Sequence, residues 1–227
     1  MQKISCIVPI YNEATRVGSV LDALSKHSLI DEVIVVNDGS TDNSEELLKQ
    51  RSDIKLISYQ KNRGKTLALK EGLKATQNDL VILIDSDLVG LDAQAISTLV
   101  EPVIKNQADI TISLRKNALL VYLFFNLDFV SGERVFNKNI LGNLDILDTL
   151  PKFGFESYLN QIIIAKKLRL TVVYWPKVVS PRKAVKEGSY AGIVGDFKMV
   201  RQIIKLLGFG GMIKMFITLH SMRQVVR

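Results

Sequence analysis

Short uninterrupted apolar runs alternate with segments of helical periodicity over the first half of this chain of 227 residues. Such runs are typical of strands buried on both faces, which occur in mainly parallel sheets covered by helices on either side. The alternation therefore predicts an α/β fold with helices on both faces of the sheet. The predicted strands comprise residues 4–10, 32–37, 54–59, 80–84 and 109–114, and the predicted helices comprise residues 14–26, 42–50, 65–76 and 92–105.

Polar residues follow the first four predicted strands, at the point where each strand ends. They are Tyr11-Asn12-Glu13, the segment 37–42, the segment 62–65 and Asp85-Ser86-Asp87. In parallel sheets, ligands bind outside the carboxyl ends of the strands. Four consecutive strand ends with such groups favour a functional site over ordinary turn chemistry.

Asp85 and Asp87 give the strongest chemical signal because they directly follow the apolar run at 80–84. Two carboxylates one residue apart can share a divalent cation, and Mg²⁺ or Mn²⁺ prefers such oxygen ligands together with phosphate. A solvated acidic turn is the alternative for an isolated pair. The position of this pair, fourth in the series of strand ends, favours metal binding.

The segments around Asp38 and Lys65 have two interpretations each. Asp38 can accept hydrogen bonds from a base or ribose, or it can belong to a turn in which Ser40 and Thr41 cap the next helix. Lys65 follows a glycine, but a P-loop requires another glycine at position 59, which is tyrosine. Lys65 at a helix start remains well placed to meet phosphate. The first predicted strand is not followed by GxGxxG, which disfavours a dinucleotide-dependent dehydrogenase.

This ordered set of motifs resembles glycosyltransferase family 2, whose members have the GT-A fold with a Rossmann-like sheet. The matching residues are 7–13, 35–42, 62–65 and 85–87, so the resemblance covers roughly residues 4–115. A looser resemblance links the chain to short dolichol- and polyprenyl-phosphate sugar synthases. It rests on Ser131-Gly132-Glu133-Arg134 and on Arg115 at the end of the fifth strand.

The resemblance implies a site for a UDP- or GDP-linked sugar. Pro9, Tyr11, Glu13 and Asp38 would hold the nucleoside, and Lys65 would lie near the base or diphosphate. Asp85, with Ser86 beside it, would face the ribose or the metal, and Asp87 would bind the Mg²⁺ or Mn²⁺ that bridges the diphosphate. Family members usually invert the anomeric carbon in one direct displacement. Bound cations neutralise the charge that builds up on a departing nucleoside diphosphate.

The acceptor side departs from the family pattern. Many members carry a Glu-Asp pair whose carboxylate deprotonates a hydroxyl acceptor, whereas this chain has Glu156 followed by Ser157. Glu156 would be the catalytic base or would orient its neighbours. A polyprenyl phosphate acceptor needs no base, and Ser180 stands where related synthases have a histidine near the metal. The residues expected to hold an acceptor phosphate are Arg115, Arg134, Arg182 and Lys183.

The net charge of +7 is unevenly distributed. Residues 1–156 carry 17 basic and 21 acidic side chains, a net of −4, while residues 157–227 carry 13 and 2, a net of +11. Further helices are predicted over 118–127, 155–167, 190–207 and 212–226, and a strand over 170–174. We expect one GT-A domain over 1–189, with a nucleotide-sugar part at 1–115 and an acceptor part at 116–189, followed by basic amphipathic helices over 190–227.

The basic tail is either a solvated face of helices packed on the core or an anchor on an anionic membrane surface, where each Lys or Arg contributes about 1 kcal/mol. We favour the anchor, with residues 118–129 dipping in beside it. No stretch approaches the roughly 20 apolar residues of a membrane span. The expected location is the cytoplasm, peripherally on the inner face of the cell membrane, with an oligomer compatible with the sequence.

Three other functions are compatible with parts of the sequence. A transferase acting on a saccharide or lipid hydroxyl, with Glu156 as base, is the nearest. A nucleotidyltransferase also presents paired acids, but it normally has a Gly-rich basic loop where this chain has Tyr11-Asn12-Glu13. A nucleic-acid-binding module would explain the basic tail, but the chain lacks interleaved aromatic platforms, so no nucleic-acid partner is expected. The single cysteine, Cys6, is predicted to be a core residue, and the chain has no Cys/His cluster suited to zinc.

Overall fold

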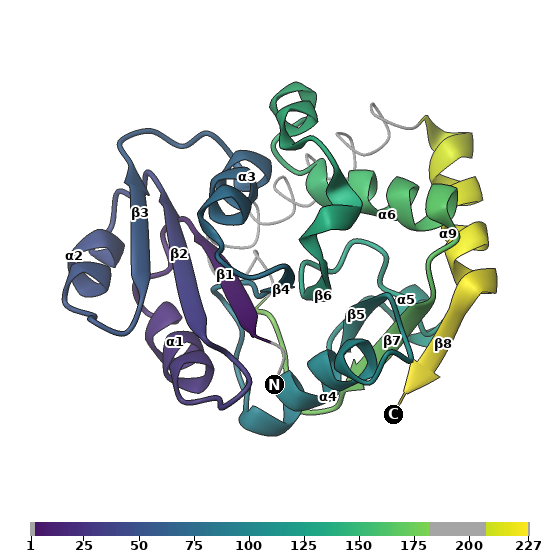
Figure 1. Ribbon diagram of the computed structural model, residues 1–227, viewed down its shortest axis with the longest axis horizontal. Coiled ribbons are helices and arrows are strands. Elements are labelled where there is room, and N and C mark those ends of the chain that lie inside the picture. The colour runs from purple at the N-terminus through teal and green to yellow at the C-terminus, as the bar shows by residue number, and fades with distance from the viewer. Residues whose placement is uncertain (1–2, 182–207, 227) are drawn as a thin grey trace.

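The predicted α/β architecture is confirmed by a computed structural model, which describes residues 3–181 and 208–226. In these residues eight strands form one sheet in the order β3-β2-β1-β4-β6-β5-β7-β8, with β3 and β8 at its edges (Figure 1). All neighbouring pairs are parallel except those of β6 with β4 and with β5. The strands are β1 (Ile4–Ile10), β2 (Glu32–Asp38), β3 (Lys55–Tyr59), β4 (Leu80–Leu83), β5 (Ile110–Arg115), β6 (Arg134–Asn137), β7 (Leu170–Trp175) and β8 (Arg223–Val226).

Helices cover both faces of the sheet, as the apolar strands predict. Side chains alternate across a strand, so Ile4, Cys6 and Val8 of β1 pack with α1 and α4, whereas Ile7 packs with α3 on the other face. In Figure 1, α3 and α6 lie above the sheet, and α1 and α4 lie below it. The helices are α1 (Val17–Ser25), α2 (Ser44–Lys49), α3 (Lys65–Ala75), α4 (Ala93–Ile104), α5 (Leu120–Phe124), α6 (Phe155–Lys166) and α9 (Phe209–Met222), with 3-10 turns η1 (Lys138–Leu141) and η2 (Leu144–Thr149).

The strand order reverses at β1, and this reversal places the site. Ile7 of β1 lies opposite Ile34 of β2 on one side and Leu83 of β4 on the other. The chain thus runs outward in two directions from β1, which leaves a crevice at the carboxyl ends of β1 and β4. The polar segments that end these strands, including Asp85, meet at this edge.

The structure corrects three of the predicted boundaries. Arg134–Asn137 forms the antiparallel strand β6, which lies between β4 and β5 in the sheet. The sequence did not predict this strand, because four residues give little periodic signal. The helix predicted over 118–127 shortens to Leu120–Phe124, since Asn126 adopts the left-handed conformation (φ 46°) that ends helices. The helix predicted over 212–226 ends at Met222, and Arg223–Val226 pairs with β7 instead.

The tail is only partly described. The amphipathic helix predicted over 190–207 lies outside the described residues. α9 packs Met215 and Leu219 into the same core cluster as α6, so the described part of the tail is continuous with the domain. None of the helices within residues 3–181 and 208–226 is long and apolar enough to cross a membrane.

Candidate active site

Lys65, the first residue of α3, forms ion pairs with two acidic residues, Asp85 on the predicted donor side and Glu156 on the predicted acceptor side. Its Nζ lies 2.7 Å from Oδ1 of Asp85 and 2.9 Å from Oε1 of Glu156. Burial alone would lower the pKa of Lys65, but the Asp85 and Glu156 carboxylates raise it well above its ordinary value. Lys65 is therefore a fixed positive charge between the predicted donor and acceptor sides.

A threonine beside Lys65 explains why Glu156 reaches it. The Thr66 hydroxyl donates to the carbonyl of Pro151 (2.8 Å) and accepts from the backbone N–H of Gly154 (3.0 Å), and the Thr66 N–H donates to the carbonyl of Lys152 (3.0 Å). Gly154 directly precedes α6, whose first turn holds Glu156. The starts of α3 and α6 are thereby fixed to each other.

Asp38 holds the loop that leads into α3. Its two carboxylate oxygens accept from the backbone N–H groups of Arg63 and Gly64, each at 2.7 Å. Gly64 has φ 101°, and a Cβ there would lie 2.5 Å from the Lys152 side chain, so glycine is required. Asp38 is 3% exposed, and its visible role is to position Lys65; the nucleoside contact implied by the resemblance stays a prediction.

The loops after β1 and β2 are also linked. The N–H of Asn12 donates to the Ser40 hydroxyl (3.0 Å), and Oδ1 of Asn12 accepts from the N–H of Thr41 (2.7 Å). The sequence offers Ser40 and Thr41 as caps of α2, and the structure does not show this. Instead α2 begins at Ser44, whose N–H donates to Asp42 (3.0 Å).

The remaining predicted nucleoside residues lie at the same edge. Pro9 lies in β1, Tyr11 follows it and is 46% exposed, and Glu13 is nearly buried and pairs with Arg16 at 2.8 Å. Ser86 is buried between the two aspartates. Tyr11 thus presents an accessible ring at the crevice, whereas the Glu13 carboxylate pairs with Arg16, the residue just before α1.

Asp87 contacts the segment that precedes residue 182. The Ser180 hydroxyl donates to Oδ2 of Asp87 at 2.9 Å. Asn117 fixes this segment, because its side chain donates to the Ser180 carbonyl (2.7 Å) and accepts from the Ser180 N–H (3.2 Å). Ser180, at the position where related synthases were expected to have histidine, therefore lies beside the Asp85-Ser86-Asp87 motif. Arg182 and Lys183, predicted to hold phosphate, lie outside the described residues.

The segment Ser131-Gly132-Glu133-Arg134 lies against the Lys65–Asp85 pair. A Cβ on Gly132 would lie 2.4 Å from Nζ of Lys65 and 2.6 Å from Oδ1 of Asp85. Glu133 is fully buried and accepts from the hydroxyls of Ser113 (2.6 Å) and Ser131 (2.7 Å). These bonds hold the Gly132 backbone where a side chain does not fit.

Replacing Gly132 with alanine is expected to lower turnover about tenfold to a hundredfold while changing the free energy of unfolding by less than about 1 kcal/mol. The atoms that the new Cβ meets are the mobile ends of Lys65 and Asp85, so these ends move and the fold does not. Steady-state kinetics and urea unfolding check this. Gly142→Ala is the control, because a Cβ there meets no atom within 4 Å. Unchanged turnover in Gly132→Ala would contradict the placement of this segment over the site.

Two arginines predicted to bind an acceptor phosphate differ in their exposure to solvent. Arg115, at the end of β5, pairs with Glu133 (3.2 Å) and Asp128 (3.6 Å) and is partly exposed. Burial opposes its charge, but Glu133 and Asp128 raise its pKa. Burial raises the pKa of Asp128 to about 6, although Arg115 counteracts this. Arg115 remains a candidate for the acceptor side.

The phosphate-binding role predicted for Arg134 does not fit the structure. Its side chain is fully buried, and its nitrogens donate to the carbonyls of Ser131 and Phe129 (2.8 Å each) and to Asn160 Oδ1 (2.7 Å). Burial lowers its pKa to about 10, which still leaves it charged at neutral pH. Arg134 therefore anchors the segment 131–134 from beneath. The burial of Arg134 follows from its place in β6, a strand of four residues that the sequence pattern does not reveal.

Sequence reasoning missed Thr66, Gly132 and Glu133 as residues that shape the site. Thr66 reads as an ordinary first-turn residue, and Gly132 reads as an ordinary loop glycine. Both act through partners that are far away along the chain. The looser resemblance at residues 131–134 was the one available signal for Gly132 and Glu133.

The donor set suits a hard divalent cation that also has other ligands. In the described part of the chain, no group of three or more His, Cys, Asp or Glu side chains could by itself hold a metal ion. Asp85 and Asp87 offer carboxylate oxygens at the crevice, so further ligands would come from diphosphate oxygens and water. This combination is typical of Mg²⁺, which keeps several waters and binds through one or two carboxylates plus phosphate.

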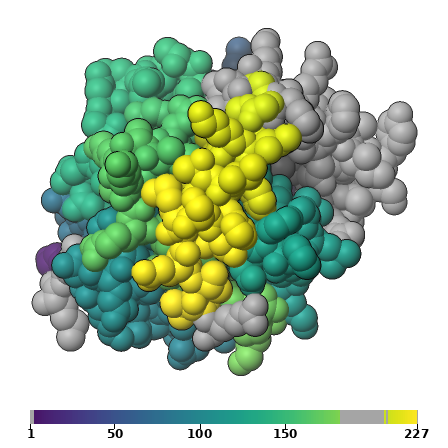
Figure 2. All heavy atoms as spheres, turned by 90° about the vertical axis from the view of Figure 1, so that its right-hand side faces the viewer, coloured from purple at the N-terminus to yellow at the C-terminus, as the bar shows by residue number. Residues whose placement is uncertain are grey.

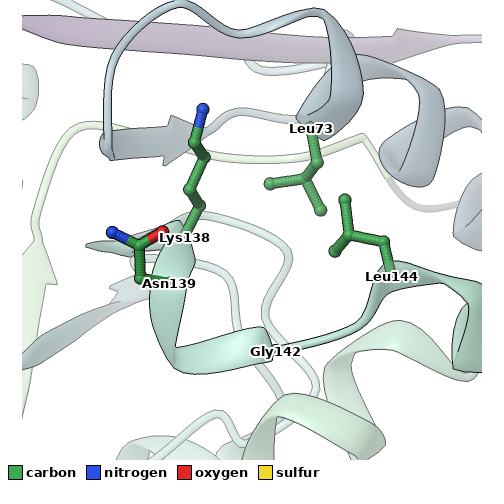
Figure 3. A pocket seen from close by; sticks show the side chains of 5 residues that line it. All are labelled: Leu73, Lys138, Asn139, Gly142 and Leu144. Atoms are coloured by element: carbon green, nitrogen blue, oxygen red, sulfur yellow. The ribbon is translucent and has the colours of Figure 1, made fainter.

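A separate hollow of about 350 Å³ lies between α3 and η1 and contains none of the predicted site residues (Figure 3). Lys138, which lines it, donates its N–H to the carbonyl of Asp79, just before β4 begins. The Lys138 ammonium donates to the Thr76 carbonyl (3.0 Å) and hydroxyl (2.9 Å). The hollow is thus at the amino end of β4, away from the crevice.

A mainly parallel sheet with one antiparallel strand, and with paired acids at the reversal of strand order, defines a GT-A-like α/β protein. Residues 5–143 match the model of glycosyl transferase family 2. The chain belongs to this family.

Curated relatives match part of the chain. Poly-β-1,6-N-acetyl-D-glucosamine synthase of Staphylococcus epidermidis is 36% identical over 110 residues, which cover 47% of this chain and 26% of that protein. Glycosyltransferase GlyA of Streptococcus pneumoniae is 32% identical over 145 residues, which cover 62% of this chain and 19% of that protein. The match spans about a quarter or less of the length of these relatives.

Solved structures share the fold over most of the chain. Glucosyl-3-phosphoglycerate synthase from Mycobacterium tuberculosis, in complex with Mn²⁺, UDP and glucosyl-3-phosphoglycerate, has a TM-score of 0.69 and 23% identity. The alignment covers 90% of this chain and 79% of that chain. A second structure of that synthase, with Mg²⁺ and UDP, has a TM-score of 0.70. The GT-A fold predicted from the motifs is confirmed.

Proposed function

We propose that this protein is a metal-dependent glycosyltransferase that moves a sugar from a UDP- or GDP-sugar to an acceptor in one direct displacement, which inverts the anomeric carbon. The observation that carries the proposal is the Lys65 ion pair with Asp85 and Glu156 at the reversal of strand order. Support comes from the family membership and from structures of the same fold with UDP and Mn²⁺ or Mg²⁺.

In this proposal Asp85 and Asp87 hold the cation, and Tyr11 and Asp38 border the nucleoside. A bound cation neutralises negative charge on the departing nucleoside diphosphate. Lys65 adds a fixed positive charge at the same edge, and Gly132 leaves room for the backbone to approach it. The segment 131–134 and the Thr66 contacts hold these groups in place before the donor binds, which reduces the reorganisation that the reaction requires.

For the acceptor we propose a polyprenyl phosphate. Its phosphate oxygen is already an anionic nucleophile and needs no base. Glu156 lies 2.9 Å from the Lys65 ammonium, so taking up a proton would cost Glu156 this ion pair. Arg115 supplies positive charge at the end of β5. A hydroxyl acceptor, with Glu156 as base, is the second candidate, because Glu156 is an acid at the crevice and lies in the first turn of α6.

A thermal-shift screen of UDP-, GDP- and dTDP-sugars, each with and without Mn²⁺, tests the donor. We expect a UDP- or GDP-sugar to raise the melting temperature in the presence of Mn²⁺, because ligands that bind only the folded state stabilise it. A protein that responds to none of these donors would contradict the proposal.

Replacing Glu156 with glutamine separates the two acceptors. With a phosphate acceptor, we expect turnover to fall less than about tenfold, because Lys65 keeps its contact with Asp85. With a hydroxyl acceptor, loss of the base should lower turnover by about 10²–10⁴-fold while donor binding persists. Turnover is measured with a polyprenyl phosphate and with a saccharide acceptor. Glu101→Gln, an exposed acid on α4, is the matched control.

A further inference from the structure

Two helices, α5 and α9, expose apolar side chains on one surface. Leu120 is 84% exposed and Phe124 is 79% exposed on α5, and Ile217 is 60% exposed on α9. Single exposed apolar residues are common, but grouped ones mark interaction sites. We call this group the α5–α9 surface; it comprises Leu119, Leu120, Val121, Phe124, Ile213 and Ile217.

The two helices form one unit. The Phe125 ring, directly after α5, packs edge-on against Phe216 of α9 at 5.3 Å and against His220 at 5.5 Å. α9 buries Met215 and Leu219 in the core, so its apolar residues point both inward and outward. Figure 2 shows the chain around α5, in teal, beside α9 and β8, in yellow, on one face.

The α5–α9 surface begins beside the active site. Asn117, which fixes Ser180 against Asp87, stands shortly before α5. Arg115, the candidate for the acceptor side, ends the strand that leads into it. A partner that contacts α5 therefore lies next to the acceptor side of the crevice.

The charge around this surface is basic. Lys116 and Lys214 are exposed, the first just before α5 and the second on α9 between Ile213 and Ile217. The described residues 208–226 contain Lys214 and Arg223 and no Asp or Glu. Apolar side chains flanked by basic ones are complementary to an anionic lipid surface, which takes up the former and attracts the latter.

We propose that the α5–α9 surface docks on an anionic lipid bilayer and thereby places the acceptor side of the crevice at the membrane. The inference rests on the proposed function in one respect: a polyprenyl phosphate presents its phosphate at the bilayer surface, where Arg115 and Glu156 would meet it. Docking itself requires no turnover and is tested directly.

The test is flotation of the full chain with vesicles of phosphatidylglycerol mixed with phosphatidylcholine, compared with pure phosphatidylcholine vesicles. We expect the wild-type protein to float with the anionic vesicles and to be released by high salt. The double variant Leu120→Ser/Phe124→Ser should bind them roughly tenfold or more weakly, because both side chains lose the contact with lipid. Leu47→Ser on α2, which removes an exposed leucine elsewhere, should float like the wild type.

Equal flotation of the double variant and the wild type would overturn the proposal. So would a wild-type protein that fails to float, or one that is dimeric in solution while the double variant is monomeric, which would make the surface an interface between copies. Nucleotide-sugar binding by the same proteins distinguishes the two proposals: donor binding without flotation contradicts the docking surface alone, and flotation without donor binding contradicts the proposed function alone. Matching unfolding curves for both variants show that the fold is intact.

Discussion

Replacing Lys65 with alanine is expected to lower turnover by about 10²–10³-fold, because the fixed positive charge between Asp85 and Glu156 is lost. Without it, the two carboxylates face the departing diphosphate unneutralised. Steady-state kinetics with saturating donor measure the loss. Lys65→Arg should recover only part of the turnover, since a planar guanidinium does not reproduce a point charge held by two carboxylates.

A matched control for this effect is Lys105→Ala, at the residue that follows α4. Lys105 pairs with Glu101 at 2.7 Å, but both side chains are largely exposed, so turnover should stay within about twofold of the wild type. A Lys65→Ala variant that keeps more than about a third of the wild-type turnover would show that this charge does not act in the reaction.

Replacing Arg134 with methionine is expected to lower the free energy of unfolding by about 3–5 kcal/mol. The side chain is fully buried, and its removal leaves the Ser131 carbonyl and the side-chain amide oxygen of Asn160 without this donor, while the Phe129 carbonyl keeps its bond from the Asn160 side-chain NH₂ (2.7 Å). Unsatisfied buried acceptors are costly, and methionine offers no replacement. Urea unfolding followed by circular dichroism measures the change.

Arg169→Met is the control for the Arg134 variant. Arg169 is also an arginine with several hydrogen bonds, including one to Asp109 at 2.8 Å, but its side chain is 48% exposed. Its replacement should cost about 1 kcal/mol or less, because water can take over its partners. Equal losses in the two variants would contradict the anchoring role of Arg134.

The strands that carry the site were predictable because burial on both faces gives a local signal. Residues 4–10 were predicted as a strand and form β1 over Ile4–Ile10, and the run at 80–84 became β4. The ends of parallel strands meet at one edge, so the sequence alone places the motif at Asp85 beside the loop that begins at Tyr11.

The contacts between distant segments were not predictable in the same way. Lys65 meets Glu156 because Thr66 bonds to the segment before α6, and no periodic pattern reports a bond between residues so far apart in the chain. The sequence predicts that Arg134 meets a phosphate, because a guanidinium suits a phosphate group. Its burial follows from strand β6, which was itself too short to predict.

The tail shows how pairing can override periodicity. Residues 212–226 have apolar residues at helical spacing, and Met212–Met222 does lie within α9. Beyond Met222 the chain pairs with β7, where Val225 lies opposite Val172, and β-branched residues suit a strand. The free edge of the sheet, which the local sequence does not reveal, decided the conformation of these last described residues.

Titration calorimetry of UDP and of GDP, each with and without Mn²⁺, tests most directly whether the edge at Asp85 and Asp87 binds a metal–nucleotide complex. For the wild-type protein we expect Mn²⁺ to strengthen the binding of one of these nucleotides by about tenfold or more, and for Asp87→Asn we expect that gain to disappear. An Asp87→Asn variant that keeps the full gain from Mn²⁺ would contradict the account.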